Sequence, residues 1–76
     1  MKKVVLRIPE IDYVLIHWEE NTFTPWVAAW CYYEDGTWGQ GHYFCKKETA
    51  LEYLAEMLRE RGPAYLETRV RSILTA

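Results

Sequence analysis

The sequence predicts an α+β domain in which a four-stranded antiparallel sheet, built from two hairpins, precedes one long and one short helix packed on one face of the sheet. Two observations support this prediction. Residues 1–44 are rich in β-branched and aromatic residues broken by turn-forming segments, and the remaining residues place apolar side chains at helical spacing. We expect the order ββββαα within a single domain, 1–76, because a chain this short has room for one core.

The first two strands are expected at 3–8 and 11–18. The first reads KVVLRI and stops at Pro9, because proline cannot donate a hydrogen bond to a neighbouring strand. In the second strand, successive side chains point to opposite sides of the sheet. One side carries Asp12, Val14, Ile16 and Trp18, and the other carries Ile11, Tyr13, Leu15 and His17. The connection at Pro9-Glu10 fits either a hairpin or a bend within one longer edge strand. The polar segment 19–25 ends in Thr-Pro and indicates a loop.

A second hairpin is expected from strands 26–33 and 37–44, and two turns are compatible with the segment between them. If Asp35 and Gly36 form a two-residue turn, Glu34 pairs with Thr37. If Glu34 and Asp35 form a type I turn with Gly36 in a left-handed bulge, Tyr33 pairs with Thr37. The difference is a shift of one residue, which changes every facing pair on the returning strand.

We favour the bulged turn because it sorts the side chains of the hairpin by size. One face then places Trp26, Ala28, Trp30 and Tyr32 opposite Phe44, His42, Gln40 and Trp38. The other face places Val27, Ala29, Cys31 and Tyr33 opposite Tyr43, Gly41, Gly39 and Thr37. We expect a helix to approach the second, smaller face, since glycines inside a strand mark a close approach or a bulge.

The helices are expected after the second hairpin. Between 46 and 61, a buried stripe is predicted at Ala50, Leu51, Tyr53, Leu54, Met57 and Leu58. The pair Gly62-Pro63 is a stop signal. A shorter helix is expected to follow, with apolar residues at Leu66, Val70, Ile73 and Leu74 and a Glu67–Arg71 pair at i,i+4.

Charge and hydropathy exclude several functional classes. The formal net charge is −2, the isoelectric point is near 5.6 and the nine basic residues are scattered, which argues against a nucleic-acid partner. No apolar run is long enough to span a membrane, and Met-Lys-Lys leads into a strand-like segment instead of a signal peptide. We therefore expect a cytoplasmic protein with two free thiols, Cys31 and Cys45.

No pattern of catalytic or metal-binding residues is present. The two histidines, His17 and His42, and the two cysteines lack the paired spacing of zinc modules. Neither a Ser-His-Asp nor a Cys-His motif is visible, and the glycines at 39 and 41 lie within a strand, where a phosphate loop does not form. We expect no enzyme activity, cofactor, metal or small-molecule substrate.

The residues expected to bind a partner are those of the aromatic hairpin face: Trp26, Trp30, Tyr32, Trp38, His42 and Phe44. Tryptophan and tyrosine dominate the energetics of protein interfaces. If the helices pack on the other face, these rings are left exposed unless another surface buries them. A two-fold homodimer through this face would bury them. If the helices pack on the rings instead, the rings are core. We favour the interface and expect a protein-interaction module that associates with itself.

Two alternatives use other features of the chain. Glutamates recur at i,i+4 along the first helix, at Glu48, Glu52, Glu56 and Glu60. Such a row could make the protein an inhibitor or regulator that docks on a basic, nucleic-acid-binding partner by mimicking a nucleic-acid backbone. It could also be a solvated face that costs about 0.2–0.5 kcal/mol per like-charged pair. The second alternative is a single-stranded nucleic-acid binder that stacks bases on the rings, although the sequence places no basic residues around them.

Overall fold

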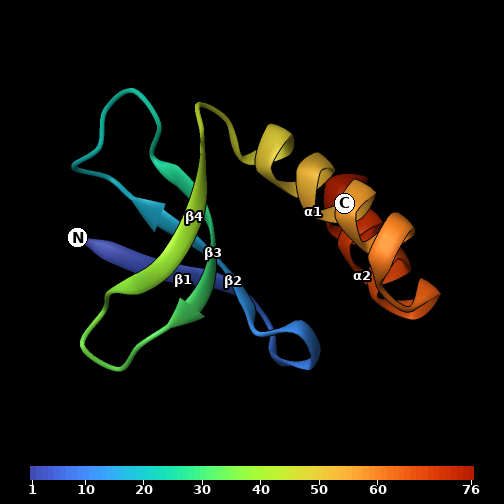
Figure 1. Ribbon diagram of the computed structural model, residues 1–76. Coiled ribbons are helices and arrows are strands. Elements are labelled where there is room, and N and C mark those ends of the chain that lie inside the picture. The colour runs from blue at the N-terminus through green and yellow to red at the C-terminus, as the bar shows by residue number, and fades with distance from the viewer.

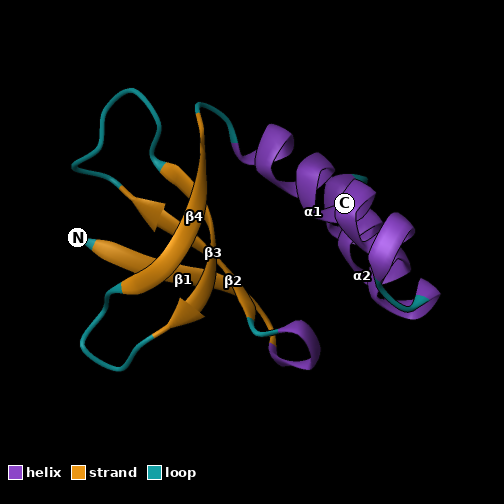
Figure 2. Ribbon diagram, viewed as in Figure 1, coloured by secondary structure: helices purple, strands orange, loops and turns teal.

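The computed structural model describes residues 1–76 and confirms the order ββββαα. The strands are β1 (Lys2–Ile8), β2 (Tyr13–Trp18), β3 (Trp26–Tyr32) and β4 (Trp38–Phe44), and the helices are α1 (Lys47–Arg61) and α2 (Ala64–Leu74). The strands pair antiparallel in the order β1-β2-β3-β4. Both helices lie on one side of the strongly twisted sheet (Figures 1 and 2). We call this side of the sheet the helix face and the opposite side the open face.

The connection between β1 and β2 makes a hairpin, as one of the two interpretations predicted. A short 3-10 helix, η1 (Pro9–Ile11), occupies the connection. It ends at Asp12, whose left-handed backbone (φ 57°) brings its N–H to the carbonyl oxygen of Pro9 at 3.3 Å. Aspartate tolerates this conformation better than most residues. The second strand therefore starts at Tyr13, two residues later than expected.

A bulge in β1 divides its side chains between the two faces. Val4 is opposite Ile16 and Leu6 is opposite Leu15, so Val5 has no partner of its own on β2. Val4 packs in the open-face cluster with Ile16, whereas Leu6 and Ile8 pack with Leu15 in the helix-face cluster. The bulge thus lets a single strand contribute to both cores.

The second hairpin has the bulged turn that the sequence favoured. Tyr33 donates its N–H to the carbonyl oxygen of Thr37 at 2.8 Å, and Gly36 has φ 88°. The strand register places Trp26 opposite Phe44, as expected for that turn. Asp35 Oδ1 accepts hydrogen bonds from the backbone N–H and the hydroxyl of Thr37, at 3.0 and 2.6 Å. The carboxylate thus holds the turn.

The helices cover the aromatic face of the hairpin, so the expectation that they approach the small face is wrong. Ala28 is fully buried in one cluster with Leu54 and Leu58 of α1, and the rings of Trp26 and Phe44 pack at its margin. Ala28 gives this face a small residue against which α1 can pack, so that the larger rings of Trp26 and Phe44 need only flank the helix.

A further correction concerns the turn end of the hairpin. Tyr32 and Trp38 were expected to share a face with Trp30, but they pack in the open-face cluster. Cys31 has φ 57°, a left-handed conformation that reverses the alternation of side chains along β3. The predicted aromatic face is therefore divided between the two sides of the sheet.

Two apolar clusters hold the fold together. The helix-face cluster contains ten buried residues: Ile8, Leu15, Ala28, Ala50, Leu51, Leu54, Ala55, Leu58, Leu66 and Val70. The open-face cluster contains Val14, Ile16, Val27 and Ala29, with Val4, Trp18, Tyr32 and Trp38 packed against it. The open face thus has a core within a single chain, formed where the bulge at Val5 and the reversal at Cys31 turn extra side chains toward it.

The helices begin and end close to the predicted residues. Gly62 follows α1 and donates its N–H to the carbonyl oxygen of Leu58 at 2.8 Å, and α2 starts immediately after Pro63. Arg71 and Glu67 form the expected i,i+4 ion pair at 2.7 Å. Neither helix is both long and apolar enough to cross a membrane.

Candidate protein-interaction site

Three of the six predicted partner-binding residues pack beside α1. Trp26 stacks on His17 with 4.2 Å between ring centroids. His42 and Phe44 contact Tyr53 of α1, with centroid distances of 4.7 and 5.4 Å. These rings therefore form the margin of the helix-face core, as the alternative interpretation of the aromatic residues predicted.

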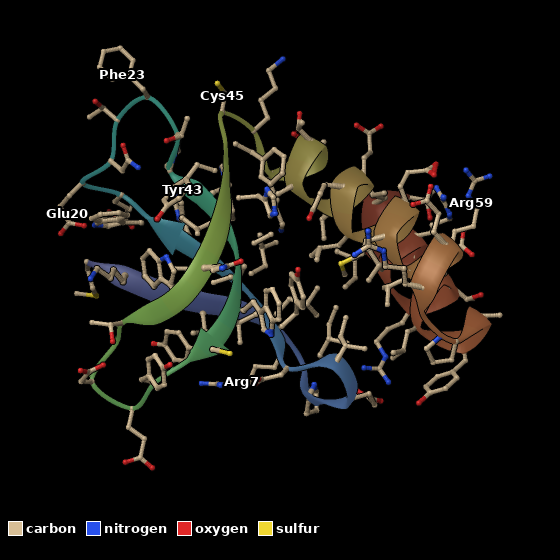
Figure 3. The ribbon with its side chains drawn as sticks, in the orientation of Figure 1. Arg7, Glu20, Phe23, Tyr43, Cys45 and Arg59 are labelled. Atoms are coloured by element: carbon tan, nitrogen blue, oxygen red, sulfur yellow. The ribbon has the colours of Figure 1, made fainter.

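Two more of the six, Tyr32 and Trp38, lie on the open face with basic side chains above them. Lys2 Nζ lies 5.1 Å from the ring centroid of Trp18 and 5.2 Å from that of Trp38. Arg7, labelled in Figure 3, places its guanidinium carbon 5.7 Å from the ring of Tyr32. The fold thus brings basic side chains to these rings, which the sequence alone did not indicate. Because the basic groups lie over the rings, they occupy the positions in which a nucleic-acid base would stack.

Trp30, the remaining predicted residue, is the only exposed tryptophan, with 44% of its surface accessible. Its ring is nearly parallel to that of Tyr13, with 10° between the planes and 6.3 Å between the centroids. This offset stacking fixes the ring orientation without covering its outer side. Trp30 thus presents a partly exposed aromatic surface to solvent.

Beside Trp30 a cavity of about 220 Å³ opens between the sheet and the end of α1. Its lining is mainly apolar and consists of Ile11, Tyr13, Trp30, Met57, Leu58, Arg61 and Gly62. A second hollow on the other side of Trp30 is lined by Trp30, Cys31, Gly39 and Gln40. We call these two hollows, which share Trp30, the Trp30 groove.

The polar side chains that line the Trp30 groove are few: Tyr13 and Arg61 in the cavity and Gln40 in the second hollow. Partial burial raises the pKa of the Tyr13 phenol above its ordinary value of 10.0, and neighbouring Tyr53 raises it further. Tyr13 is therefore protonated at neutral pH and keeps a hydroxyl donor. Arg61 is the one charged residue in the cavity lining, and its guanidinium presents a planar set of donors that suits a carboxylate.

Sequence reasoning identified Trp30 but missed the other residues of the groove. Tyr13, Met57 and Arg61 come from β2 and from the last turns of α1, and only the packing of the helix on the sheet brings them together. A partial signal was available, because Met57 and Arg61 are spaced i,i+4 and share one side of α1.

The glutamates of the alternative acidic ridge are all exposed along α1, at Glu48, Glu52, Glu56 and Glu60. Glu56, however, forms ion pairs with Arg59 at 2.8 Å and with Arg71 of α2 at 3.6 Å. The two arginines thus neutralise Glu56, which lies between Glu52 and Glu60. The row of negative charge is therefore interrupted, unlike that of a phosphate backbone.

Comparison with known proteins adds no relative: no family model, no curated protein and no solved structure matches the chain.

Proposed function

We propose that the protein is a non-enzymatic protein-interaction module whose Trp30 groove receives an apolar side chain of a partner. The observation that supports this most directly is Trp30 itself, a tryptophan held by stacking on Tyr13, with 44% of its surface exposed, at the mouth of an apolar cavity. Tryptophan and arginine are the residues most enriched among the hot spots of protein interfaces, and Met57 can adapt its shape to the incoming group.

The size of the cavity and its one charge define the kind of partner. The cavity beside α1 has a volume of about 220 Å³ and the hollow beside β4 about 270 Å³, each below the roughly 300–1,000 Å³ typical of small-molecule sites, which favours a single side chain in each over a whole ligand. Arg61 in the cavity lining favours a carboxylate near that side chain. We therefore propose a peptide segment that carries a large apolar residue close to an aspartate or glutamate.

Both thiols of the chain, Cys31 and Cys45, are free. Unpaired cysteines are usual in a reducing compartment, so we place this module in the cytoplasm. Self-association through the predicted aromatic face has less support, because five of its six side chains already pack against neighbours of the same chain.

A phage-displayed library of random peptides tests the groove, because it samples many combinations of side chains and requires no identified partner. We expect the selected peptides to combine an apolar residue with a nearby carboxylate and to shift the backbone amide resonances of Tyr13, Trp30 and Met57 in the folded protein. Trp30→Ala should weaken their binding at least about thirtyfold, the effect of losing a hot-spot residue. Arg61→Gln should weaken binding of the acidic peptides alone.

Phe23 offers the matched control, because it projects from the tip of the β2–β3 loop and is 86% exposed (Figure 3). Phe23→Ala removes an exposed ring away from the groove and should leave peptide binding unchanged. Circular dichroism of each variant establishes that it is folded. Peptides that bind folded Trp30→Ala as well as they bind the wild type, or a library that yields no binder, would contradict the proposal.

A further inference from the structure

The two edges of the sheet are built differently. The outer strand β1 carries Lys2, Lys3 and Arg7, contains the bulge at Val5 and is followed by Pro9. Edge charges, bulges and prolines are the features that prevent a strand from pairing with another molecule. This edge is therefore protected against association.

The opposite edge, β4, has none of these protections. Its sequence, WGQGHYF, contains no charged residue and no proline, and its pairing with β3 continues without a register shift. The strand pairs with β3 alone (Figure 1). Its residues Gly39, Gln40, His42 and Tyr43 are exposed. In Figure 3, Tyr43 lies on the side of β4 away from the helices. An unprotected edge of seven residues is a template for a further strand.

The hydrogen-bonding pattern shows which backbone groups of β4 are available. Trp18 donates its N–H to the carbonyl oxygen of Pro25 at 2.7 Å, and in this register Val27 and Ala29 also direct their backbone groups to β2. Because the backbone N–H and carbonyl groups of successive residues in a strand point to opposite neighbours, those of Trp26, Ala28 and Trp30 are directed to β4. Their partners on β4 are Phe44, His42 and Gln40. The N–H and carbonyl groups of the intervening Gly41 and Tyr43 point away from the sheet.

We propose that β4 pairs antiparallel with β4 of a second copy of the chain, about a two-fold axis at Gly41, so that the two sheets become continuous. Gly41 is the midpoint of β4, and a two-fold axis there pairs the strand over its full length. Gln40 then faces His42 of the second copy, and Gly39 faces Tyr43 of the second copy. This interface shares Gly39 and Gln40 with the second hollow of the Trp30 groove, whereas the cavity between Trp30 and α1 contains no residue of β4.

The composition of β4 favours a second copy over an unrelated strand. About Gly41, polar residues occupy the first equivalent positions (Gln40 and His42) and aromatic residues the third (Trp38 and Phe44), while between them Gly39 is equivalent to Tyr43. Two identical strands without charges do not repel each other, and an aromatic residue opposite a glycine is a favourable cross-strand pair. Gln40 and His42 can also form a hydrogen bond across the pair.

A charge exchange tests this pairing. In the double variant Gln40→Glu with His42→Glu, every cross-strand Gln40–His42 contact becomes a pair of carboxylates, and in Gln40→Lys with His42→Lys it becomes a pair of ammonium groups. Like charges placed directly opposite destabilise a strand pair, so each variant alone should dimerise at least about tenfold more weakly. An equimolar mixture of the two variants should recover the dimer, because opposite charges then face each other.

Sedimentation velocity measures these states. We expect the wild type at high concentration, and the mixture, at twice the chain mass of 9.1 kDa, and each charged variant alone at the single mass. Ser72→Lys, which adds a charge on α2, should leave the dimer intact. The rescue in the mixture also shows that the charged variants are folded. A wild type that stays at the single mass at millimolar concentration, or a mixture that stays monomeric, would overturn the proposal.

Amide hydrogen exchange locates the contact. The N–H groups of Gly41 and Tyr43 should exchange slowly in the wild-type dimer and at least about tenfold faster in either charged variant, because they lose their partners. The amides of β1 should not change. A dimer in which Gly41 and Tyr43 exchange as fast as in the charged variants would place the interface elsewhere and overturn the pairing of β4.

Discussion

Trp30 and Tyr32 lie on opposite faces of the sheet, although a single residue separates them in β3. Trp30 lines the cavity beside α1, and Tyr32 packs on the open face with Val14 and Val27. Residues two apart in a regular strand share a face, and the left-handed conformation of Cys31 between them breaks that rule. The break leaves Trp30 at the end of the regular aromatic row, where its ring is exposed.

Substitution of Cys31 tests the cost of this conformation. Cys31→Val should lower the free energy of unfolding by about 1–2 kcal/mol, because a β-branched residue tolerates a positive φ poorly. Cys31→Gly should leave that free energy equal or up to about 1 kcal/mol higher, since glycine adopts this conformation without strain. Urea denaturation measures both. A valine variant as stable as the glycine variant would show that Cys31 carries no strain.

Asp35 should make the stability of the domain depend on pH. Its hydrogen bonds from the hydroxyl and N–H of Thr37 lower its pKa from the ordinary value of 3.8. A carboxyl whose pKa is lower in the folded state stabilises the fold above its unfolded pKa, and this stabilisation is lost as the pH falls through the folded pKa. The thermal midpoint of Asp35→Asn should therefore be below that of the wild type at pH 6, and the difference should shrink below pH 3.8.

The neighbouring carboxylate provides the control for this experiment. Glu34 is exposed in the same turn, so Glu34→Gln should follow the wild-type pH profile. If the difference in thermal midpoint between Asp35→Asn and the wild type is constant from pH 6 to pH 2, the charge of Asp35 does not stabilise the fold and the prediction is wrong.

Substitution of Gly36 should destabilise the protein because of its backbone conformation alone. Its φ of 88° lies in the left-handed region, and no heavy atom outside Gly36 and its two chain neighbours lies within 4 Å of the position that a Cβ would occupy. Gly36→Ala should therefore lower the free energy of unfolding by about 1–2 kcal/mol through backbone strain, without a steric clash. Gly36→Asn should recover part of this loss, since asparagine tolerates positive φ. Equal losses for the two variants in urea denaturation would contradict this explanation.

Ile16 tests whether the open face has a core within one chain. Ile16 is fully buried, so Ile16→Ala should lower the free energy of unfolding by about 2–5 kcal/mol, as in any packed core. The loss should not vary with protein concentration, because no second chain is needed to bury this side chain. Val5→Ala, at the partly exposed bulge, should cost much less. A loss for Ile16→Ala that appears only at high concentration would indicate that a partner chain covers the open face.

The amino-acid sequence by itself determined the elements of this protein. The period of two between Tyr13 and Trp18, the helical stripe from Ala50 to Leu58 and the left-handed turn at Gly36 are all local patterns, because they depend on residues close together in the chain. The register of the second hairpin followed from its turn for the same reason. What remained ambiguous was which side of the hairpin the helix would cover.

Tertiary structure decided the faces and the candidate site. The bulge at Val5 and the reversal at Cys31 each change the side to which later residues point, and neither has a strong signal in the local sequence because both are held in place by packing across strands. The Trp30 groove depends on the same packing. Trp30 was recognisable as a binding residue from its type, whereas Tyr13 and Arg61 reach it only because α1 folds back over the sheet, a contact between segments distant in the chain.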